Sequence, residues 1–594
     1  MSLQSIPERN EIDAAFKWHT GDLYPDDASF LCELEYLGTQ TERLPELEKR
    51  GFPDAASLLA FYDFCSDMMP VINRLNTYSM LKCDEDTSNQ LYQDYKSRVS
   101  AALVKYRSAC SFKLPKLMAL SDEDIESYCK AEPALVFYRH DIDECRRLKA
   151  HTLDEQSEHI LAKAGDILET PDNIFAMMSY ADLKFPPVEH DGQTYPLTAG
   201  TFIPLMQNNN RDIREKAYNN YYSVYNDFQN TYAAILSAQV KALSFESELR
   251  GYPSTLDAAL DATHVDTAVY HSLIDTVRAN MHYMHRYVGL RKRMLNVDND
   301  IYAPLVDDNS VSNIPFDKAR EDVINAMSVY GDEYVNILKA GFDNGWIDIY
   351  ENKGKRSGAY SCGAYIHPYV LLNYHNDLDS EFTLAHEMGH AMHSYLSNTH
   401  QKPLYAGYRI FVAEVACNEA LLMQYLLKNT TDSKERAVLI NHFLEQFKGT
   451  LYRQTMFAEF ELEINERAAK GESLTASALC DIYRKLNEDY FGPDMEIDDN
   501  IALEWARIPH FYYDYYVYQY ATGFSAAIAL SDKILNEGEP AVRRYLNFLC
   551  SGCTKDPVSL LRDAGVDMSG PEPVETALKL FNSLMDEMEE LLLK

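Results

Sequence analysis

The pentapeptide His386-Glu387-Met388-Gly389-His390 has the residue types and the spacing of a metal site. On a helix, residues i and i+4 lie on one face one turn apart, so the two imidazoles can bind a single Zn²⁺ ion. Glu387 follows the first histidine and can act as a general base on a water that the metal activates. Among proteins of this length and histidine content, chance alone produces the pattern in roughly one of twenty or thirty. The alternative is a pair of histidines hydrogen-bonded inside a buried helix.

A catalytic zinc ion needs a third protein ligand and an open position for water. A third histidine six residues after His390 is excluded because residue 396 is leucine, and a glutamate 19 or 20 residues after it is excluded because residues 409 and 410 are arginine and isoleucine. The next candidate is Glu414, a carboxylate within the otherwise apolar run Phe411–Ala416. Burying it without a partner would cost several kcal/mol. We expect it to bind the metal, and the alternative is an ion pair with Arg409.

A tyrosine-rich segment near residue 515 could donate hydrogen bonds to a developing oxyanion. Tyr513 and Tyr520 are seven residues apart, which is two helical turns, and His510 and Tyr516 fall on roughly the same side. A neutral phenol donates a hydrogen bond without adding charge beside a metal. The alternative is a Tyr-rich helix that belongs to the core. We expect that alternative to hold for Tyr512, Tyr515 and Tyr518.

The stretch from residue 343 to 376 is rich in glycine and in β-forming residues. It predicts strands at Trp346–Tyr350 and Tyr365–Tyr374. Because Pro368 lies inside the second run, we expect an edge strand, and an exposed edge can pair with an extended peptide through backbone hydrogen bonds. We expect His367 to be hydrogen-bonded or exposed rather than a metal ligand. His393 continues the face of the histidine pair, so we expect it to pack against the site or to orient it.

Most of the remaining chain has the periodicity of amphipathic helices interrupted by proline and glycine. Residues 30 to 110 predict antiparallel helices, with Pro45, Pro53 and Pro70 as interruptions. Residues 184–204 predict a strand and a turn, and we place a boundary there. The chain after Asp379 is expected to be helical.

Length and composition limit the possible classes of protein. The 594 residues include 55 Lys and Arg against 91 Asp and Glu, a net charge of −36, which disfavours binding to nucleic acid or to an anionic membrane surface. A hydrophobic content of 46% excludes global disorder. Eleven scattered cysteines do not form a disulfide framework. We find no signal-peptide pattern and no long apolar run, so we expect a cytoplasmic protein without a membrane partner.

Four motifs in order, together with the N-terminal opening, resemble the oligoendopeptidase F branch of the thimet oligopeptidase (M3) metallopeptidases. They are Ser357–Ser361, Phe382–Tyr395, Phe411–Ala416 and His510–Tyr513 with its continuation Tyr516–Gly523, and the opening comprises Trp18 and Leu23–Pro25. The resemblance spans nearly the whole chain. The branch usually has two more residues between the Glu414-Val415-Ala416 triplet and the Asn-Glu pair that ends at Glu419.

The resemblance implies a mainly α, two-lobed zinc-peptidase fold with a deep central channel and a small β-sheet beside the active-site helix. The expected parts are an N-terminal helical region (1–115), a second helical region of the N-terminal lobe (116–200) and a zinc-metallopeptidase catalytic domain (201–594). One zinc ion per chain is expected, and the implied reaction is cleavage of internal bonds in short peptides.

The resemblance also assigns roles to residues. The implied zinc ligands are His386, His390 and Glu414, and the catalytic residues are Glu387, His510, Tyr513 and Tyr520. The residues expected to bind substrate are Tyr516, Gly358, Tyr360, Tyr365 and His367. His393 and Glu419 are expected to support the metal ligands.

Two other functions remain open from the sequence. An exopeptidase on the same scaffold would need a fixed group for a chain terminus, and Arg356 or Lys355 could supply it. A non-catalytic peptide-binding protein is disfavoured by the intact Glu387. An intramembrane zinc protease is excluded because we find no apolar run long enough to span a membrane. The sequence leaves open whether the protein is a monomer or a homo-oligomer.

Overall fold

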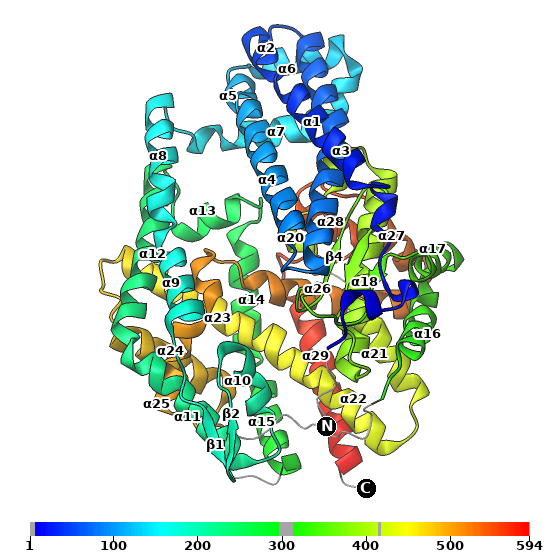
Figure 1. The fold of residues 1–594 in the computed structure, drawn as a ribbon. Helices are drawn as coiled ribbons and strands as arrows, with labels where there is room; N and C mark the ends of the chain where they lie inside the picture. The colour runs from blue at the N-terminus through cyan, green and yellow to red at the C-terminus, as the bar shows by residue number, and fades with distance from the viewer. Residues whose placement is uncertain (1–5, 296–312, 414–416, 593–594) are drawn as a thin grey trace. The chain divides into compact units, whose positions relative to one another are not determined.

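The computed structural model describes residues 6–295, 313–413 and 417–592 (Figure 1). The predicted ligand Glu414 lies outside the described residues. The chain separates into two compact units. Unit 1 comprises Met1–Ala150, Val311–Leu426 and Leu530–Gly565, and unit 2 comprises His151–Ser310, Leu427–Ala529 and Val566–Lys594. The division falls inside η5, α21 and α26, whose bounds are given below. The three expected regions with boundaries at residues 115 and 200 stay a prediction.

Helices dominate both units, which confirms the predicted mainly α class. The helices of the first unit are α1 (Asp27–Thr41), α2 (Leu44–Arg50), α3 (Ala55–Glu85), α4 (Gln90–Cys110), α5 (Lys113–Met118), α6 (Asp122–Ala131), α7 (Arg139–Arg147), α16 (Phe316–Ala326), α17 (Asp332–Asp343), α18 (Leu378–His400), α19 (Pro403–Ala406), α20 (Ile410–Ala413), α27 (Glu539–Leu549) and α28 (Pro557–Ala564). Its short helical turns are η1 (Arg9–Glu11), η2 (Ala14–Phe16), η3 (Thr20–Asp22), η4 (Pro133–Tyr138) and η8 (Met327–Tyr330).

The second unit contains α8 (Glu155–Leu168), α9 (Thr170–Met177), α10 (Ala199–Met206), α11 (Arg211–Asp227), α12 (Gln229–Leu249), α13 (Thr255–Asp261), α14 (Thr267–Ala279), α15 (Met281–Leu295), α22 (Ser433–Gln446), α23 (Arg453–Ala469), α24 (Ala476–Phe491), α25 (Asp499–Ala502) and α29 (Glu572–Leu592). Its short turns are η6 (Met178–Asp182), η9 (Phe447–Tyr452), η10 (Glu504–Arg507) and η11 (Pro509–Tyr512). The elements that run across the division are η5 (Leu148–His151), α21 (Asn418–Asn429) and α26 (Tyr518–Glu537).

α3 begins at a capping residue and contains Pro70, which was expected to interrupt it. Asp54 caps the helix by accepting a hydrogen bond from the Ser57 backbone at 2.8 Å. Pro70 was expected to interrupt the helix, but it lies inside it. A proline removes one backbone hydrogen bond and costs about 3 kcal/mol or more. The buried side chains on either side, Met68 and Val71, belong to the core of unit 1, and this packing offsets the cost.

α3 is also the one described helix that is long and apolar enough to cross a membrane by length and composition. Such a helix is weak evidence for a membrane span, because the core helix of a globular protein passes the same test. Its apolar face contributes Leu58, Phe61, Leu75 and Leu81 to the core of unit 1. The expected location in the cytoplasm stays a prediction.

Unit 1 contains a three-stranded sheet of β3 (Ile347–Asp348), β4 (Tyr360–Cys362) and β5 (Tyr369–Leu371). The order is β3-β5-β4, with β5 parallel to β3 and antiparallel to β4. The expectation of an edge strand at Tyr365–Tyr374 was therefore wrong, because β5 is central. Pro368 precedes β5 and removes no hydrogen bond from the ladder. The two outer strands are β3 and β4, and β4 and β5 pack against α18.

Unit 2 contains a hairpin of β1 (Val188–His190) and β2 (Gln193–Tyr195), where a strand and turn were predicted. Asp191 and Gly192 connect the strands, and both have positive φ values, 47° and 74°. A two-residue turn with positive φ at both positions matches the right-handed twist of a hairpin, and Asp-Gly is a favoured sequence for it.

Candidate active site

The two histidines of the pentapeptide lie on one face of α18. The helix begins at Leu378, where Asp377 caps it by accepting a hydrogen bond from the Ser380 backbone at 2.8 Å. Nε2 of His386 and Nε2 of His390 lie 2.9 Å apart. The spacing of four residues has brought the two imidazoles together, as the helical geometry requires.

Glu419 fixes the orientation of the first imidazole. It lies in the first turn of α21, and its Oε1 is 2.5 Å from Nδ1 of His386. Because a carboxylate can only accept, Nδ1 donates and Nε2 keeps its lone pair free of a proton in the neutral ring. The neighbouring Asn418 donates from Nδ2 to the Ala385 carbonyl at 3.3 Å, which holds the start of α21 against α18. A carboxylate behind a histidine is the usual support of a metal ligand.

Burial keeps His390 in the form that binds metals. The pKa of His390 lies well below its ordinary value, chiefly because burial disfavours the charged ring, with smaller contributions from His386 and His393 nearby. A neutral imidazole is the species that donates a lone pair to a metal. Glu387, between them in sequence, is also buried, with 7% of its surface exposed.

His393 packs instead of facing the pair. Its ring stacks on Tyr408 with centroids 3.8 Å apart and an interplanar angle of 4°, and Phe548 lies 5.4 Å away. Burial lowers the pKa of His393 to about 3, so the ring is neutral. The Tyr408 hydroxyl in turn contacts Ser394 at 2.9 Å. These contacts agree with a packing role, and a supporting role for the metal ligands stays a prediction.

The histidine pair fits a single zinc ion. Two nitrogens bound to one tetrahedral zinc ion at about 2.0–2.1 Å lie about 3.3 Å apart, close to the 2.9 Å between the two Nε2 atoms. Within the described residues, no group of three His, Cys, Asp or Glu side chains could hold a metal. The proposed third ligand, Glu414, is outside those residues, so its role stays a prediction.

A second group of predicted site residues lies in unit 2. His510, Tyr513, Tyr516 and Tyr520 form a cluster of rings whose centroids are between 5.5 and 6.3 Å apart. Tyr513 is 48% exposed, so the cluster reaches the surface. Burial lowers the pKa of His510 below its ordinary value. The clustering agrees with the prediction, although the predicted reason for it was wrong.

The segment is not one helix, as the seven-residue spacing had assumed. Of the four residues in the cluster, only Tyr520 lies in α26, which begins at Tyr518. Asp514 and Tyr515, before this helix, have left-handed φ values of 48° and 62°. Such values are uncommon for residues other than glycine and need support from their surroundings. Glu461 supplies it by accepting from the Tyr515 backbone N–H at 3.0 Å, and Gln239 donates to Asp514 at 3.0 Å. Sequence spacing alone does not reveal this turn.

The other tyrosines of this segment are buried, as expected. Tyr512, Tyr515 and Tyr518 are each exposed by 6% or less. Tyr512 packs on Phe175 of α9 with ring centroids 4.5 Å apart, and the hydroxyl of Tyr515 contacts Thr255 at 2.9 Å. These side chains anchor the segment that presents the cluster.

The remaining predicted substrate contacts lie around the sheet of unit 1. Gly358 has a φ of 82° and accepts a hydrogen bond from Asn373. Tyr360, in β4, donates to Asp84 at 2.9 Å. Tyr365 donates to the Pro403 carbonyl at 2.8 Å. Their contact with substrate stays a prediction.

His367 is hydrogen-bonded, in agreement with the expectation that it is hydrogen-bonded or exposed rather than a metal ligand. Its Nε2 lies 3.2 Å from Asp22, and its ring stacks on Trp346 at 5.5 Å and 3°. Trp346 and Asp22 thus hold the ring within unit 1. This arrangement gives no support to substrate binding by His367, which stays an untested prediction.

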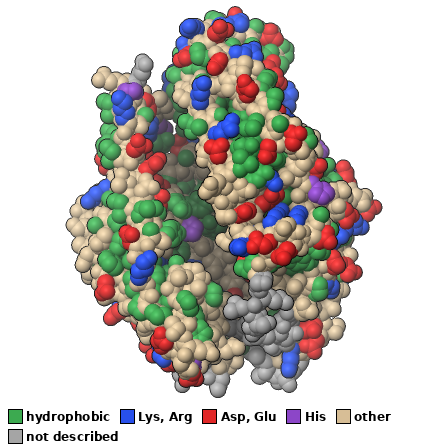
Figure 2. Space-filling model, viewed as in Figure 1, with side chains coloured by type: hydrophobic (Ala, Val, Ile, Leu, Met, Phe, Trp, Pro, Cys, Tyr) green, Lys and Arg blue, Asp and Glu red, His purple; other side chains and the backbone are tan. Residues whose placement is uncertain are grey.

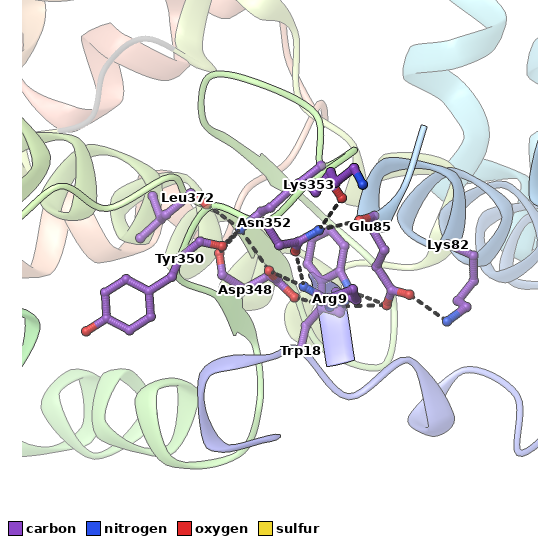
Figure 3. A network of polar contacts seen from close by, with 10 residues as sticks. Arg9, Trp18, Lys82, Glu85, Asp348, Tyr350, Asn352, Lys353 and Leu372 are labelled. Carbon is purple, nitrogen blue, oxygen red and sulfur yellow. Dashed lines mark hydrogen bonds and ion pairs between the residues drawn. The ribbon is translucent and has the colours of Figure 1, made fainter. Parts of the chain in front are cut away.

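A buried ionic network around Asp348 of β3 was not predicted from the sequence (Figure 3). Asp348 of β3 is 1% exposed and contacts Lys355 at 2.8 Å, while Arg9 donates to it at 2.7 Å and to Asn352 at 3.1 Å. Lys355 has no exposed side-chain surface. It therefore cannot capture a chain terminus, which leaves Arg356 as the other residue named for that role in an exopeptidase. A lone aspartate in the apolar run Trp346–Tyr350 was the available signal.

Comparison with known proteins decides the family. The model of peptidase family M3 matches residues 204–580, and that of oligopeptidase F matches residues 116–185. The chain belongs to peptidase family M3. It is a metalloendopeptidase of this family, in the oligoendopeptidase F branch that the motifs indicated.

Similar proteins align with this M3 peptidase over nearly its whole length. It is 41% identical to oligopeptidase PepF of Bacillus subtilis over 99% of this chain and 89% of that protein. It is 37% identical to an oligoendopeptidase F homologue of Lactococcus lactis, with 99% of both chains covered. A peptidase structure from Chlamydophila abortus matches with a TM-score of 0.90 at 34% identity and 99% coverage of both chains. Oligoendopeptidase-F from Enterococcus faecium matches with a TM-score of 0.75 at 35% identity, covering 95% and 99%.

Proposed function

We propose that this chain is a zinc-dependent endopeptidase that hydrolyses internal bonds of short peptides. The contact between Nδ1 of His386 and Glu419 supports this most directly. It turns the lone pair of Nε2 toward the same place as Nε2 of His390. Metal ligands of hydrolytic zinc sites are arranged in this way. The names of the relatives, which are oligopeptidases and oligoendopeptidases, support the choice of short peptides as substrates.

The proposed ligands are His386, His390 and Glu414, with one zinc ion per chain. When bound, zinc would acidify a water and polarise the carbonyl of the scissile bond. Glu419 keeps the proton of His386 on Nδ1, which leaves Nε2 available. The metal-binding role of Glu414 rests on the family motif around it and on the ligand set of two histidines and one glutamate.

Glu387 is the proposed general base. Its carboxylate takes a proton from the attacking water and later passes it to the nitrogen of the leaving amine. The residue is buried, so water around it is limited and the proton stays close to the reacting atoms. His510, Tyr513 and Tyr520 are the proposed donors to the oxyanion of the substrate. Tyr516, Gly358, Tyr360 and Tyr365 remain proposed substrate contacts.

The test is a comparison of three variants in metal content and in activity. Glu387→Gln should abolish hydrolysis and retain one zinc ion per chain by metal analysis, since Gln cannot accept the proton. Glu414→Ala should lose the zinc ion as well as the activity. Glu381→Gln, which changes another buried carboxylate of α18, is the matched control and should keep both. Hydrolysis by Glu387→Gln would contradict the mechanism.

Peptides blocked at both ends separate the endopeptidase from an exopeptidase. An endopeptidase cuts an acetylated and amidated peptide at an internal bond, which mass spectrometry of the products identifies. If only peptides with a free end are cut, and always at a fixed distance from that end, the protein is an exopeptidase.

A further inference from the structure

Two consecutive residues of unit 2 adopt an uncommon backbone conformation beside the aromatic cluster. The φ values of Asp514 and Tyr515 are 48° and 62°, in the left-handed region that a bulky residue such as tyrosine rarely adopts. Backbone strain of this kind persists only where the surrounding structure holds it, and it concentrates at functional sites. We call the pair Asp514–Tyr515 the strained turn.

The strained turn brings two halves of the aromatic cluster together. His510 and Tyr513 precede it in the chain, and Tyr516 and Tyr520 follow it. Across the turn, the rings of His510 and Tyr520 lie 5.9 Å apart, and those of Tyr513 and Tyr516 lie 6.3 Å apart. A change in the backbone of the turn would therefore separate the two halves without removing any side chain of the cluster.

Side chains from four helices of unit 2 hold the strained turn. Oε1 of Glu461, on α23, accepts a hydrogen bond from the backbone N–H of Tyr515 at 3.0 Å. This bond fixes the peptide group that joins the two left-handed residues. The contacts to the side chains of the turn are Gln239 of α12 with Asp514 at 3.0 Å, Thr255 of α13 with the Tyr515 hydroxyl at 2.9 Å, and Tyr270 of α14 with the Tyr515 ring at 5.6 Å.

Glu461 is itself in an unfavourable environment. Carboxylate side chains are spread over the face shown in Figure 2, whereas Glu461 is only 2% exposed. Burial raises the pKa of Glu461 well above its ordinary value, although the hydrogen bond from Tyr515 lowers it, so the carboxyl group is neutral. Its second oxygen, Oε2, has no hydrogen-bond partner among the residues that the structure describes. A buried polar atom without a partner reduces stability and calls for an explanation.

Two unfavourable features thus meet at one hydrogen bond. The carboxyl group of Glu461 with its second oxygen unbonded lies on one side of it, and the strained turn lies on the other. Tyr513 immediately precedes the strained turn, so both features adjoin a proposed donor to the oxyanion. Natural proteins retain locally unfavourable features mainly at functional sites. Their coincidence here favours a functional explanation over a purely structural one.

We propose that Glu461 is a positioning residue, which holds the strained turn and thereby keeps Tyr513 and Tyr520 where the oxyanion needs them. The inference rests on the proposed function, in which the aromatic cluster donates to the oxyanion, and it adds a residue that does not touch the substrate. Misplacement of a donor by about 1 Å can lower the rate about 10²-fold. Because the oxyanion forms only in the transition state, loss of this positioning lowers kcat and leaves KM nearly unchanged.

The test compares two substitutions of Glu461 on a peptide blocked at both ends. Glu461→Gln keeps an oxygen that accepts from the Tyr515 N–H, so it should retain kcat. Glu461→Leu leaves that N–H without a partner, so kcat should fall about 10²-fold with little change in KM. Thr455→Val is the matched control on the same helix, because the buried Thr455 hydroxyl donates to the Leu451 carbonyl at 2.7 Å rather than to the strained turn. It should keep kcat.

A second measurement reports the geometry of the cluster without catalysis. The Cε1–H resonance of His510, assigned with a His510→Gln variant, is followed by NMR. It should shift in Glu461→Leu, because the tyrosine rings around it move, and stay in place in Glu461→Gln and Thr455→Val. Gln239→Leu removes the donor to Asp514 and should shift the same resonance. If Glu461→Leu does not fold, Gln239→Leu decides the matter, and an unmoved resonance in that variant would overturn the inference.

The phenol variants show whether Glu461 acts through the cluster. In whichever of Tyr513→Phe and Tyr520→Phe lowers kcat, Glu461→Leu should lower it further by a smaller factor than in the unchanged chain, because the two changes affect one interaction. Fully multiplied losses, a loss of kcat in Glu461→Gln equal to that in Glu461→Leu, or an unmoved His510 resonance in Glu461→Leu would each overturn the inference and leave the peptidase intact.

Failure of the proposed function gives a different result. If the unchanged chain does not cleave the blocked peptide, or if both phenol variants keep the full kcat, the proposed reaction or the oxyanion role of the cluster is refuted. Such a result would also overturn the positioning role in catalysis, whatever the resonance of His510 shows about the geometry of the rings.

Discussion

Oε1 of Glu419 accepts a hydrogen bond from Nδ1 of His386 at 2.5 Å, across the packing of α21 on α18. The two residues are 33 positions apart in the chain, and the contact determines which nitrogen of the imidazole carries the proton. The family motif usually has two more residues in the segment before this glutamate. The shorter segment of this chain nevertheless brings the carboxylate to the histidine.

Substituting Glu419 by Gln should weaken zinc binding without unfolding the protein. The amide cannot polarise Nδ1–H as a carboxylate does, and loss of such a partner typically costs 10–100-fold in metal affinity. Competition with a chromophoric chelator measures this. Asp379→Asn, an exposed acidic residue in the first turn of α18, is the control and should leave the affinity unchanged. An unchanged affinity in Glu419→Gln would show that the contact does not support the ligand.

Removing a hydroxyl from the aromatic cluster should slow catalysis. Tyr513→Phe and Tyr520→Phe each delete a donor and keep the ring packing, so kcat should fall roughly 10²–10³-fold for the one that contacts the oxyanion. Tyr512→Phe is the control, because its ring is buried against Phe175. Steady-state kinetics at several substrate concentrations separate kcat from KM. If both cluster variants keep the full kcat, these phenols do not stabilise the transition state.

Glu381 should make stability fall as pH rises. Burial, then the neighbouring Asp322, raises its pKa from 4.5 to about 8. The folded state thus holds a proton that the unfolded state has lost, so stability is full below about pH 4.5 and declines toward pH 8. Glu381→Gln removes this dependence and should flatten the stability profile between these values. Urea unfolding at pH 5, 6, 7 and 8 measures it, and parallel curves for the two proteins would contradict the expectation.

Asp348→Asn should destabilise the protein strongly. It leaves Lys355 as a fully buried cation without its carboxylate, and breaking a buried ion pair in this way costs about 3–5 kcal/mol. Desolvation already lowers the pKa of Lys355. The midpoint of urea unfolding reports the loss. Asp343→Asn changes an aspartate that is 59% exposed and pairs with Arg320, so it should shift stability by less than about 1 kcal/mol. Similar midpoints for both variants would contradict the prediction.

Local spacing was sufficient to find the histidine pair but not the reason for the aromatic cluster. His386 and His390 are four residues apart on a helix with clear apolar periodicity, and a helix puts such residues on one face. Tyr513 and Tyr520 come together through a left-handed turn that Glu461 and Gln239 stabilise from distant parts of unit 2. Partners that far away in the chain leave no periodic signal.

The strand order of the sheet, unlike the histidine pair of α18, was predicted wrongly from the sequence. The β-forming runs of the sequence located β3 and β5 but not β4, and the sequence placed Tyr365–Tyr374 at the edge, whereas β5 is central and β3 and β4 are the outer strands. Strand order depends on which segments pair through hydrogen bonds, and a proline just before a strand satisfies the same local rules as one at an edge.

The sequence by itself determined the helical class, the histidine pair with Glu387, and the family, because these depend on residue types at short and regular spacings. The tertiary structure decided which histidine Glu419 contacts, which strand of the sheet is central, and which of the two neighbouring basic residues is exposed. Arg356 and Lys355 are adjacent and chemically alike, and only the burial of one against Asp348 separates their roles. Burial and pairing are properties of the packed chain, and no local pattern encodes them.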